Sequence, residues 1–347
     1  MSDSQETVGS TPEAGAGATI RSGSGFVERV LARRELGVLL GFLVLFGLIA
    51  VTRPDIFFNW DSISGIFSRL LRQVSTYILI GVGMTYLIIG GEFDLSVGSM
   101  FAVGGIVFGI LLTEQGMAVP LALLVVLLAG VFVGLTNGAI VTKAGVPSLI
   151  TTIGMLSILR GVAFFLTPGG SRSVDQDLPL VQVFGGSRDV IGVEVTNQVF
   201  WALGILIVFG LLLQKTRFGY HVYAVGDDVE AASNSGINTD RVKIINFVIT
   251  ATLAALAGAI SISYFGTMFG TAGSGFELLV IAAVVIGGTN LFGGEGTLLG
   301  TFLGALVIGV IPVLLVLNGF AVEIQEFLTG VVIIAAVLVD IFIRRRG

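Results

Sequence analysis

Long runs of apolar residues, almost free of charge and separated by short polar segments, recur along the chain and limit what it can fold into. Of its 347 residues, 54% are hydrophobic and 12% are charged, and the mean hydropathy is +0.99. Soluble domains carry roughly 25% charged residues. Because about 20 consecutive apolar residues can cross the hydrocarbon core as a helix, we expect an all-α polytopic membrane protein.

About ten of these runs can be placed as transmembrane helices. They lie near residues 37–52, 74–90, 96–113, 118–141, 149–167, 199–213, 244–264, 278–292, 297–317 and 324–343. A count of eight follows if two short runs do not cross and the segments around 92–98 and 271–275 re-enter the membrane instead. Residues 63–73 carry Arg69 and Arg72 at helical spacing, which predicts a surface-lying segment leading into the second span.

Charge sets the expected orientation. Residues 1–25 are rich in Ser, Gly, Thr and Glu without periodicity, which predicts a disordered tail before a transmembrane domain over 26–347. Basic residues flank the first run and end the chain, so by the positive-inside rule both termini are expected in the cytoplasm, with the chain in the cytoplasmic membrane. The same threading puts Lys143 and the charged segment 215–243 inside, and Arg53, Arg172 and Arg188 outside.

The segment 215–243 has its own capping signals. Asp227 or Asp228 can cap a short helix running through Ser235, because a side-chain oxygen there satisfies free backbone N–H groups. Gly236 can then end the helix in a left-handed conformation, with Ile237 contacting the last turn.

A helix of two turns is unstable alone in water, so it must pack against something. Ala231 and Ala232 are small enough to allow close approach to a groove on another protein. An ordinary capped helix in a loop between two membrane spans fits the same residues.

Polar side chains interrupt the apolar runs at three places. Glu92 and Asp94 flank the third run, where Asp94 or Ser96 either caps the helix or has a functional role. Thr151, Thr152, Ser157 and Arg160 lie along the fifth run, and Glu277, Thr289 and Asn290 lie in a glycine-rich block. Such groups can hydrogen-bond a substrate or a neighbouring helix. The chain has no cysteine and one histidine, so neither a metal site nor a catalytic constellation is expected.

Three motifs carry a resemblance to a known family. Residues 230–237 (EAASNSGI) are similar to its E-A-A-x-x-x-G-I segment, 94–99 (DLSVGS) to its G-x-D-L-S-V-G-S stretch, and 272–289 to its A-G-x-G-x-E-L-x-x-I-A-A-V-V-x-G-G-T pattern. The matches run in order over about residues 40–340. On these residues the chain resembles the permease subunits of ribose-type ATP-binding-cassette (ABC) importers, which carry monosaccharides.

The resemblance implies a type II importer-like permease built from inverted repeats, not an enzyme. Its coupling helix, which docks into a separate ATPase subunit, would comprise Asp227, Asp228, Glu230, Ala231, Ala232, Gly236 and Ile237. The candidate substrate pathway comprises Asp94, Ser96, Thr151, Thr152, Ser157, Glu277, Thr289 and Asn290.

The implied partners are an ABC ATPase, an extracytoplasmic sugar-binding protein, a second permease copy in a homodimer and membrane lipid, but no nucleic acid. Residues 293–296 (GGEG) lack the lysine of a phosphate-binding loop. ATP and magnesium are therefore expected on the ATPase, with no cofactor on this chain.

Two alternatives remain at this point. A branched-chain amino-acid or nucleoside permease would share the architecture. An ion-coupled secondary transporter would need buried carboxylates, for which Glu92 and Asp94 are the candidates.

Overall fold

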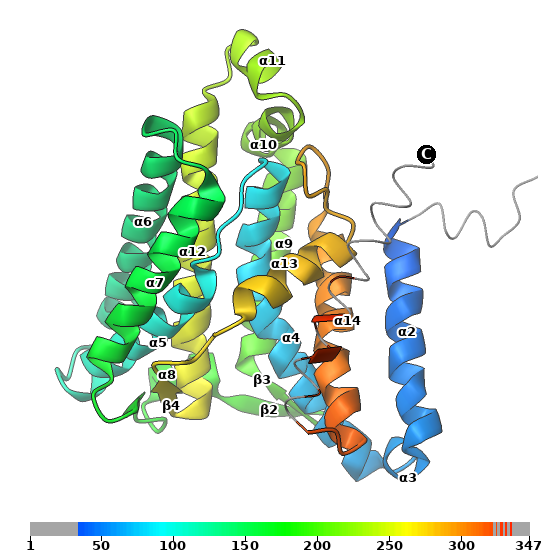
Figure 1. Ribbon diagram of the computed structural model, residues 1–347. Helices are drawn as coiled ribbons and strands as arrows, with labels where there is room; N and C mark the ends of the chain where they lie inside the picture. Colours follow the sequence, from blue (N-terminus) through cyan, green and yellow to red (C-terminus); the bar gives the residue numbers. More distant parts are fainter. Residues whose placement is uncertain (1–33, 322–323, 325–326, 329, 332–333, 335–347) are drawn as a thin grey trace, which may run out of the picture.

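The computed structural model describes residues 34–321 together with 324, 327–328, 330–331 and 334. The predicted tail lies outside these residues, as does most of the last predicted span. The described part is a bundle of helices whose long members run roughly side by side, with two short helices standing beyond one end (Figure 1).

The elements follow one another as a helical chain with a few short strands. In order they are α2 (Arg34–Thr52), α3 (Pro54–Phe57), α4 (Trp60–Ile89), α5 (Val97–Thr113), α6 (Val119–Lys143), α7 (Ser148–Leu166), β1 (Ser171–Ser173), α8 (Pro179–Gly185), β2 (Ser187–Val190), β3 (Val193–Thr196), α9 (Asn197–Lys215), α10 (Arg217–Asp227), α11 (Val229–Asn234), α12 (Thr239–Phe265), β4 (Thr267–Phe269), α13 (Phe276–Ile286) and α14 (Leu298–Leu317).

Within the described residues, seven helices are long and apolar enough to cross a membrane: α2, α4, α6, α7, α9, α12 and α14. They confirm the all-α polytopic membrane architecture. α5 is apolar but has 17 residues.

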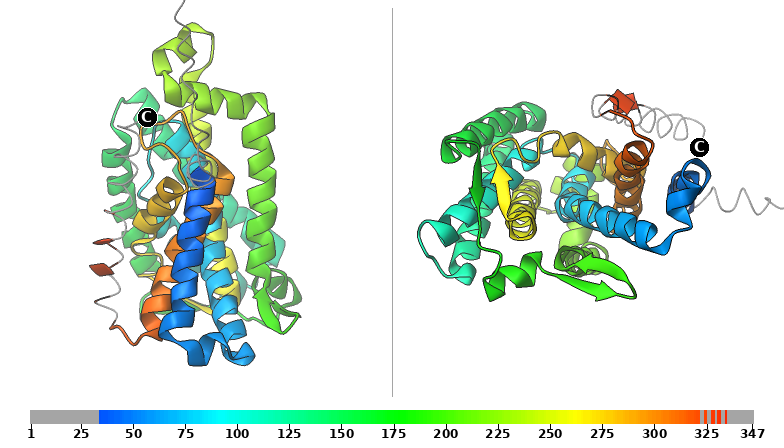
Figure 2. Two further views of the ribbon diagram at one scale, coloured as in Figure 1. Left: turned by 90° about the vertical axis from the view of Figure 1, so that its right-hand side faces the viewer. Right: turned by 90° about the horizontal axis from the view of Figure 1, so that it is seen from below.

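Two helices, α4 and α12, form the centre of the bundle. Every residue of α4 from Val74 to Ile89 is buried. α12 packs along α6, α5 and α4, while α2 lies at the edge against α14 (Figures 1 and 2). The apolar core therefore follows these two long helices from one end of the bundle to the other.

Glycines bring α6 and α12 into backbone contact. Gly130, Gly134 and Gly138 recur every four residues and face α12. A Cβ atom at Gly130 would lie 2.7 Å from the Cα of Thr252, and one at Gly138 would lie 2.8 Å from the Cα of Ile244. Small residues permit this spacing, which maximises dispersion contacts between helices where lipid supplies no hydrophobic drive.

The predicted span at 278–292 does cross the bundle, but not as one continuous helix. β4 lies at the end opposite α11, whereas the Gly294 N–H donates to the Ile89 carbonyl at the α11 end, so the chain passes from one end to the other here (Figure 1). The helix there, α13, has 11 residues, or about 16 Å at 1.5 Å per residue, and the hydrocarbon core is about 30 Å thick. The segment 287–297 then continues to the start of α14 without helical structure. Hydropathy favoured a span because this connection is itself rich in apolar and glycine residues.

The prediction of a surface-lying segment at 63–73 is wrong. These residues lie in the first half of α4, a continuous helix of 30 residues. Ile63, Ile66 and Leu70 are buried against the bundle, so the apolar stripe faces protein.

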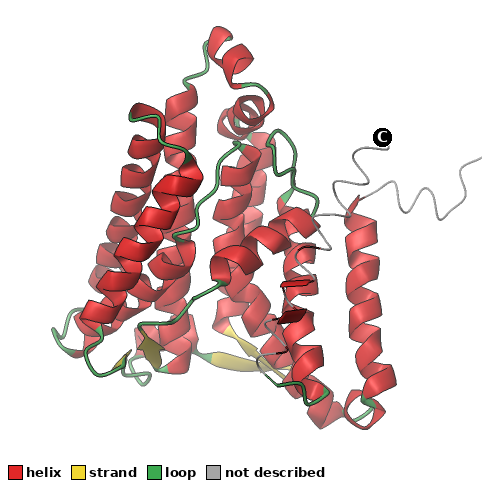
Figure 3. Ribbon diagram, viewed as in Figure 1, coloured by secondary structure: helices red, strands yellow, loops and turns green. Residues whose placement is uncertain are grey.

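Short strands lie at the end of the bundle opposite α11 (Figure 3). β1 pairs with β4, and β2 pairs with β3 in a hairpin, both antiparallel. They belong mainly to the polar segment 168–198, which closes that end.

Candidate coupling segment and helix breaks

The segment between α9 and α12 forms two capped helices. The Thr216 hydroxyl accepts a hydrogen bond from the Gly219 N–H at 3.3 Å at the start of α10, which runs across the end of the bundle (Figure 2). The Asp228 carboxylate accepts from the N–H groups of Glu230 and Ala231, each at 2.9 Å. The predicted cap is therefore Asp228, while Asp227 ends α10.

The predicted helix end is confirmed as well. Gly236 has φ +85°, the left-handed conformation that glycine adopts without strain. The Ile237 N–H then donates to the Ala232 carbonyl at 3.1 Å, which closes the last turn. Asn238 caps the next helix by accepting from the Arg241 N–H at 2.9 Å.

Burial divides the seven candidate coupling residues. Asp227, Asp228, Glu230, Ala231 and Gly236 are exposed, whereas Ala232 is buried and Ile237 is half-buried. α11 thus presents an acidic, small-residue surface outward. The α10 helix was not anticipated, although Thr216 is the kind of residue that caps a helix.

α10 is seated on the backbone of two other elements. A Cβ atom at Gly226 would collide with the Ile89 carbonyl at the end of α4, and one at Gly293 would lie 2.6 Å from the Gly226 carbonyl. The Gly294 N–H donates to the same Ile89 carbonyl at 2.9 Å, and the Tyr223 hydroxyl donates to the Gly296 carbonyl at 2.7 Å. We call this contact the glycine junction, formed by Gly226, Ile89, Gly293 and Gly294.

Two ion pairs tie α12 to its neighbours near the same end. Lys243 lies 2.6 Å from Glu92, and both side chains are largely buried. Lys143 lies 2.6 Å from Asp240 at the exposed ends of α6 and α12. Glu92 therefore has a structural partner in the segment between α4 and α5.

Asp94 is fully buried and hydrogen-bonded on both carboxylate oxygens. The Ser96 N–H and hydroxyl donate to one oxygen at 2.7 and 2.5 Å, and the Asn137 amide donates to the other at 3.3 Å. Ser96 lies at the cap position of α5 but makes no side-chain cap there. Asn137 was missed, although an asparagine inside an apolar span is itself a signal for a buried polar partner.

The starts of the two short helices, α5 and α13, lie against each other. A Cβ atom at Gly98 would collide with the Gly273 carbonyl and with the Glu277 carboxylate. The Ser99 hydroxyl and Glu277 Oε2 are buried there without a hydrogen-bond partner among the described residues. Arg160 donates to the Gly270 and Ala272 carbonyls, each at 2.8 Å, and so anchors the turn before α13.

The remaining pathway candidates do not form one cluster. Thr152 donates to the Ser148 carbonyl and Thr151 is buried without a partner within the described chain. Ser157 faces outward from α7 and bonds its own helix. Thr289 and Asn290 lie in the loop after α13, where Asn290 accepts from the Phe292 N–H at 3.1 Å. The structure thus joins Asp94 to Ser96, and leaves the others apart.

The chain matches a known protein family over most of its length. Residues 66–337 match the family described as "Branched-chain amino acid transport system / permease component". No solved structure matches.

Several curated proteins are similar over most of their length. The ribose import permease protein RbsC of Escherichia coli K12 is 36% identical over 305 residues, which is 87% of this chain and 92% of that protein. The corresponding protein of Haemophilus influenzae is 34% identical over 308 residues, 87% and 91% of the two chains. The autoinducer 2 import system permease protein LsrC of Photorhabdus luminescens is 34% identical over 309 residues, 88% and 89% of the two chains. With a family match over most of its length and these relatives, the chain belongs to the family of permease components of branched-chain amino acid transport systems.

Proposed function

We propose that this chain is the permease subunit of an ABC importer that carries a monosaccharide across the cytoplasmic membrane, driven by ATP hydrolysis on a separate subunit. The names of its ribose-import relatives support a sugar. Family membership does not favour an ion-coupled transporter, and the partners of Glu92 and Asp94 account for both carboxylates structurally.

The observation that carries the proposal is α11. It is a capped helix of six residues, too short to persist without packing, and it stands beyond the end of the bundle with its acidic face exposed (Figure 1). A groove on an ATPase subunit would supply the missing contact. ATP and magnesium would bind that subunit, so this chain needs no cofactor.

The α11 end is proposed to face the cytoplasm. Lys143, Lys215, Arg217, Arg241 and Lys243 lie in or beside the connections at that end. Arg172 and Arg188 lie at the opposite end, with Arg53. This difference follows the positive-inside rule and implies cytoplasmic termini. A sugar-binding protein would dock at the strand-bearing end, and a second copy would complete a homodimer.

Charge reversal on α11 tests the proposal in the reconstituted complex with ATPase and binding protein. Glu230→Lys should abolish substrate-stimulated ATP hydrolysis, because Glu230 is exposed on the proposed docking face. Gly236→Pro should do the same, since proline cannot adopt φ +85°. Both proteins should still insert in the membrane.

Glu194→Lys is the matched control, because it reverses an exposed charge on β3 at the other end of the bundle. It should retain the ATPase subunit through purification, whereas Glu230→Lys should lose it. Normal stimulated hydrolysis by Glu230→Lys would refute the proposed coupling surface.

A further inference from the structure

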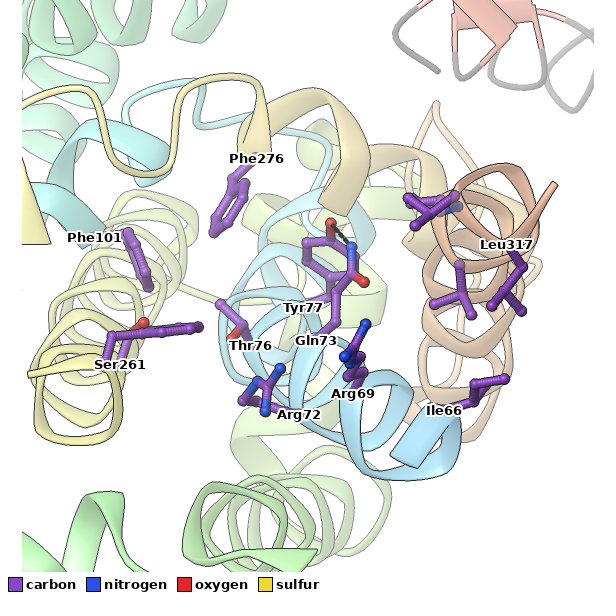
Figure 4. A pocket seen from close by; sticks show the side chains of 14 residues that line it. Ile66, Arg69, Arg72, Gln73, Thr76, Tyr77, Phe101, Ser261, Phe276 and Leu317 are labelled. Carbon is purple, nitrogen blue, oxygen red and sulfur yellow. Dashed lines mark hydrogen bonds between the residues drawn. The ribbon is translucent and has the colours of Figure 1, made fainter. Parts of the chain in front are cut away.

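A cavity of about 350 Å³ opens in the half of the bundle away from α11, between α4, α12, α13 and α14 (Figure 4). Its volume is within the range of small-molecule sites. None of the pathway residues predicted from sequence lines it. Most of its polar groups come from one face of α4, where Arg69, Arg72, Gln73 and Thr76 follow at helical spacing, and Ser261 adds a hydroxyl from α12.

The polar wall offers hydrogen-bond donors held at fixed positions. The Arg72 guanidinium donates to the Tyr264 hydroxyl at 2.7 Å and lies 4.7 Å from the centre of that ring. Gln73 donates to the Tyr77 hydroxyl at 3.0 Å, which leaves its own carbonyl oxygen available. Arg69 is exposed and makes no ion pair or hydrogen bond with any described residue. None of the described lining residues is acidic.

Aromatic rings form the floor of the cavity. The Phe276 ring lies 5.6 Å from Tyr77 in an edge-to-face arrangement and 5.1 Å from Phe101, measured between ring centres. We call Tyr77, Phe101 and Phe276 the aromatic floor. Apolar ring faces of this kind accept the C–H faces of a ligand and exclude water.

Buried polar atoms lie directly beyond the floor. Phe101 touches Gly273, which lies against Gly98 at the start of α5. Glu277 Oε2 and the Ser99 hydroxyl are buried beside this contact without partners among the described residues. A buried polar atom without a hydrogen-bond partner destabilises the protein, and a passing polar ligand would relieve this cost. From the cavity mouth inwards, a polar opening is therefore followed by the aromatic floor and then by a second polar region.

We propose that this cavity is a binding site of the permease itself for a small hydroxyl-rich ring, and that the ligand leaves it through the aromatic floor. The inference rests on the proposed function. Free arginine donors and a glutamine suit hydroxyl oxygens, and two uncompensated cations disfavour amines and metal cations. The cavity would receive the sugar on the side where a binding protein releases it.

Thiol labelling tests whether the cavity is a sugar site, because the chain has no cysteine of its own. Ser261 and Ser263 are both buried on α12, but only Ser261 lines the cavity. In the complete transporter, a membrane-impermeant charged thiol reagent added at the strand-bearing end should label Ser261→Cys and not Ser263→Cys. D-ribose delivered by the binding protein should slow the labelling of Ser261→Cys at least about fivefold.

A second measurement uses transport. Arg69→Gln should reduce D-ribose uptake about tenfold, the size expected for losing a hydrogen bond from a charged donor, while Arg69→Lys should keep part of it. Lys143→Gln removes an exposed cation at the end of α6, far from the cavity and from the strand-bearing end; it is the matched control and should transport as wild type.

The two hypotheses fail in different ways. Absence of uptake of D-ribose and of other pentoses and hexoses by the wild-type transporter would contradict the proposed substrate class. Normal wild-type uptake would overturn the cavity assignment alone if Ser261→Cys resisted labelling, if D-ribose did not slow its labelling, or if Arg69→Gln transported normally.

Discussion

Asp94 illustrates how a buried carboxylate can be held without a cationic partner. Its two oxygens accept three hydrogen bonds, from the Ser96 N–H, the Ser96 hydroxyl and Asn137. These bonds fix the chain just before α5 begins, so the carboxylate positions the first turn of that helix.

Asp94→Ala should therefore lower the free energy of unfolding by about 2–3 kcal/mol, because it leaves the N–H and hydroxyl donors of Ser96 without their acceptor in a buried site, while the Asn137 amide keeps its bond to the Ser96 hydroxyl. Thermal unfolding in detergent measures the effect. Asp61→Ala removes an exposed carboxylate from α4 and should change stability by less than about 0.5 kcal/mol. Equal unfolding temperatures for the two variants would contradict this role.

The Glu92–Lys243 pair should be energetically coupled more strongly than the exposed Lys143–Asp240 pair. The side chains are 11% and 19% exposed in the first pair, and 67% and 42% exposed in the second. Double-mutant cycles to alanine should give about 1–3 kcal/mol for the buried pair and less than about 1 kcal/mol for the exposed pair. Coupling energies of the same size would argue against a structural role for Glu92.

At this scale, sequence reasoning succeeded where the interaction is local. The cap at Asp228 and the left-handed Gly236 depend on residues within a few positions of each other. Asn137 was missed because its partner, Asp94, is 43 residues away. Nothing in the apolar run around Asn137 indicates which helix it faces.

Among the helices, α13 shows that hydropathy does not predict how long a helix is. Its 11 residues and the loop behind it are together as apolar as a full span. What shortens it is a backbone contact: a Cβ atom at Gly287 would collide with Gly300 at the start of α14. Close approach of two backbones is a tertiary feature, and composition alone does not reveal it.

A substitution at Gly226 tests how α10 is joined to the rest of the bundle. Gly226→Ala adds a methyl group where the Ile89 carbonyl already lies, so α10 must move away from α4. We expect a loss of about 1–3 kcal/mol in stability from overpacking and weaker coupling between sugar binding and ATP hydrolysis. Unfolding temperature and substrate-stimulated ATPase activity in the complete complex measure the two effects.

Gly204→Ala on α9 is the control, since nothing lies within 4 Å of a Cβ atom there. It should match wild type in both measurements. A Gly226→Ala protein that also matched wild type would exclude tight seating of α10.

Across the whole molecule, the apolar helices divide into central and peripheral ones. The most apolar windows are 89% buried in α4 and 67% in α12, but 28% in α7 and 22% in α9. The sequence placed all of them in the membrane correctly. It could not rank them by depth in the bundle, because lipid and protein interior select the same side chains.

The orientation of the whole molecule in the membrane is predicted to place the α11 end in the cytoplasm. Ser233→Cys on α11 and Asp189→Cys on β2 are both exposed, at opposite ends of the bundle. In intact cells, an impermeant thiol reagent should label Asp189→Cys only, and cell lysis should expose Ser233→Cys. The reverse pattern would invert the proposed topology.

The glycine junction also limits which conformations the protein can adopt between its inward-facing and outward-facing states. A single carbonyl, that of Ile89, touches α10 and receives the Gly294 N–H. The connection to α5 begins just after this residue, and the connection from α13 to α14 reaches it through Gly294. Any tilt of α10 must therefore move both of these connections together. A conformation in which only one of them has moved would first have to break the glycine junction.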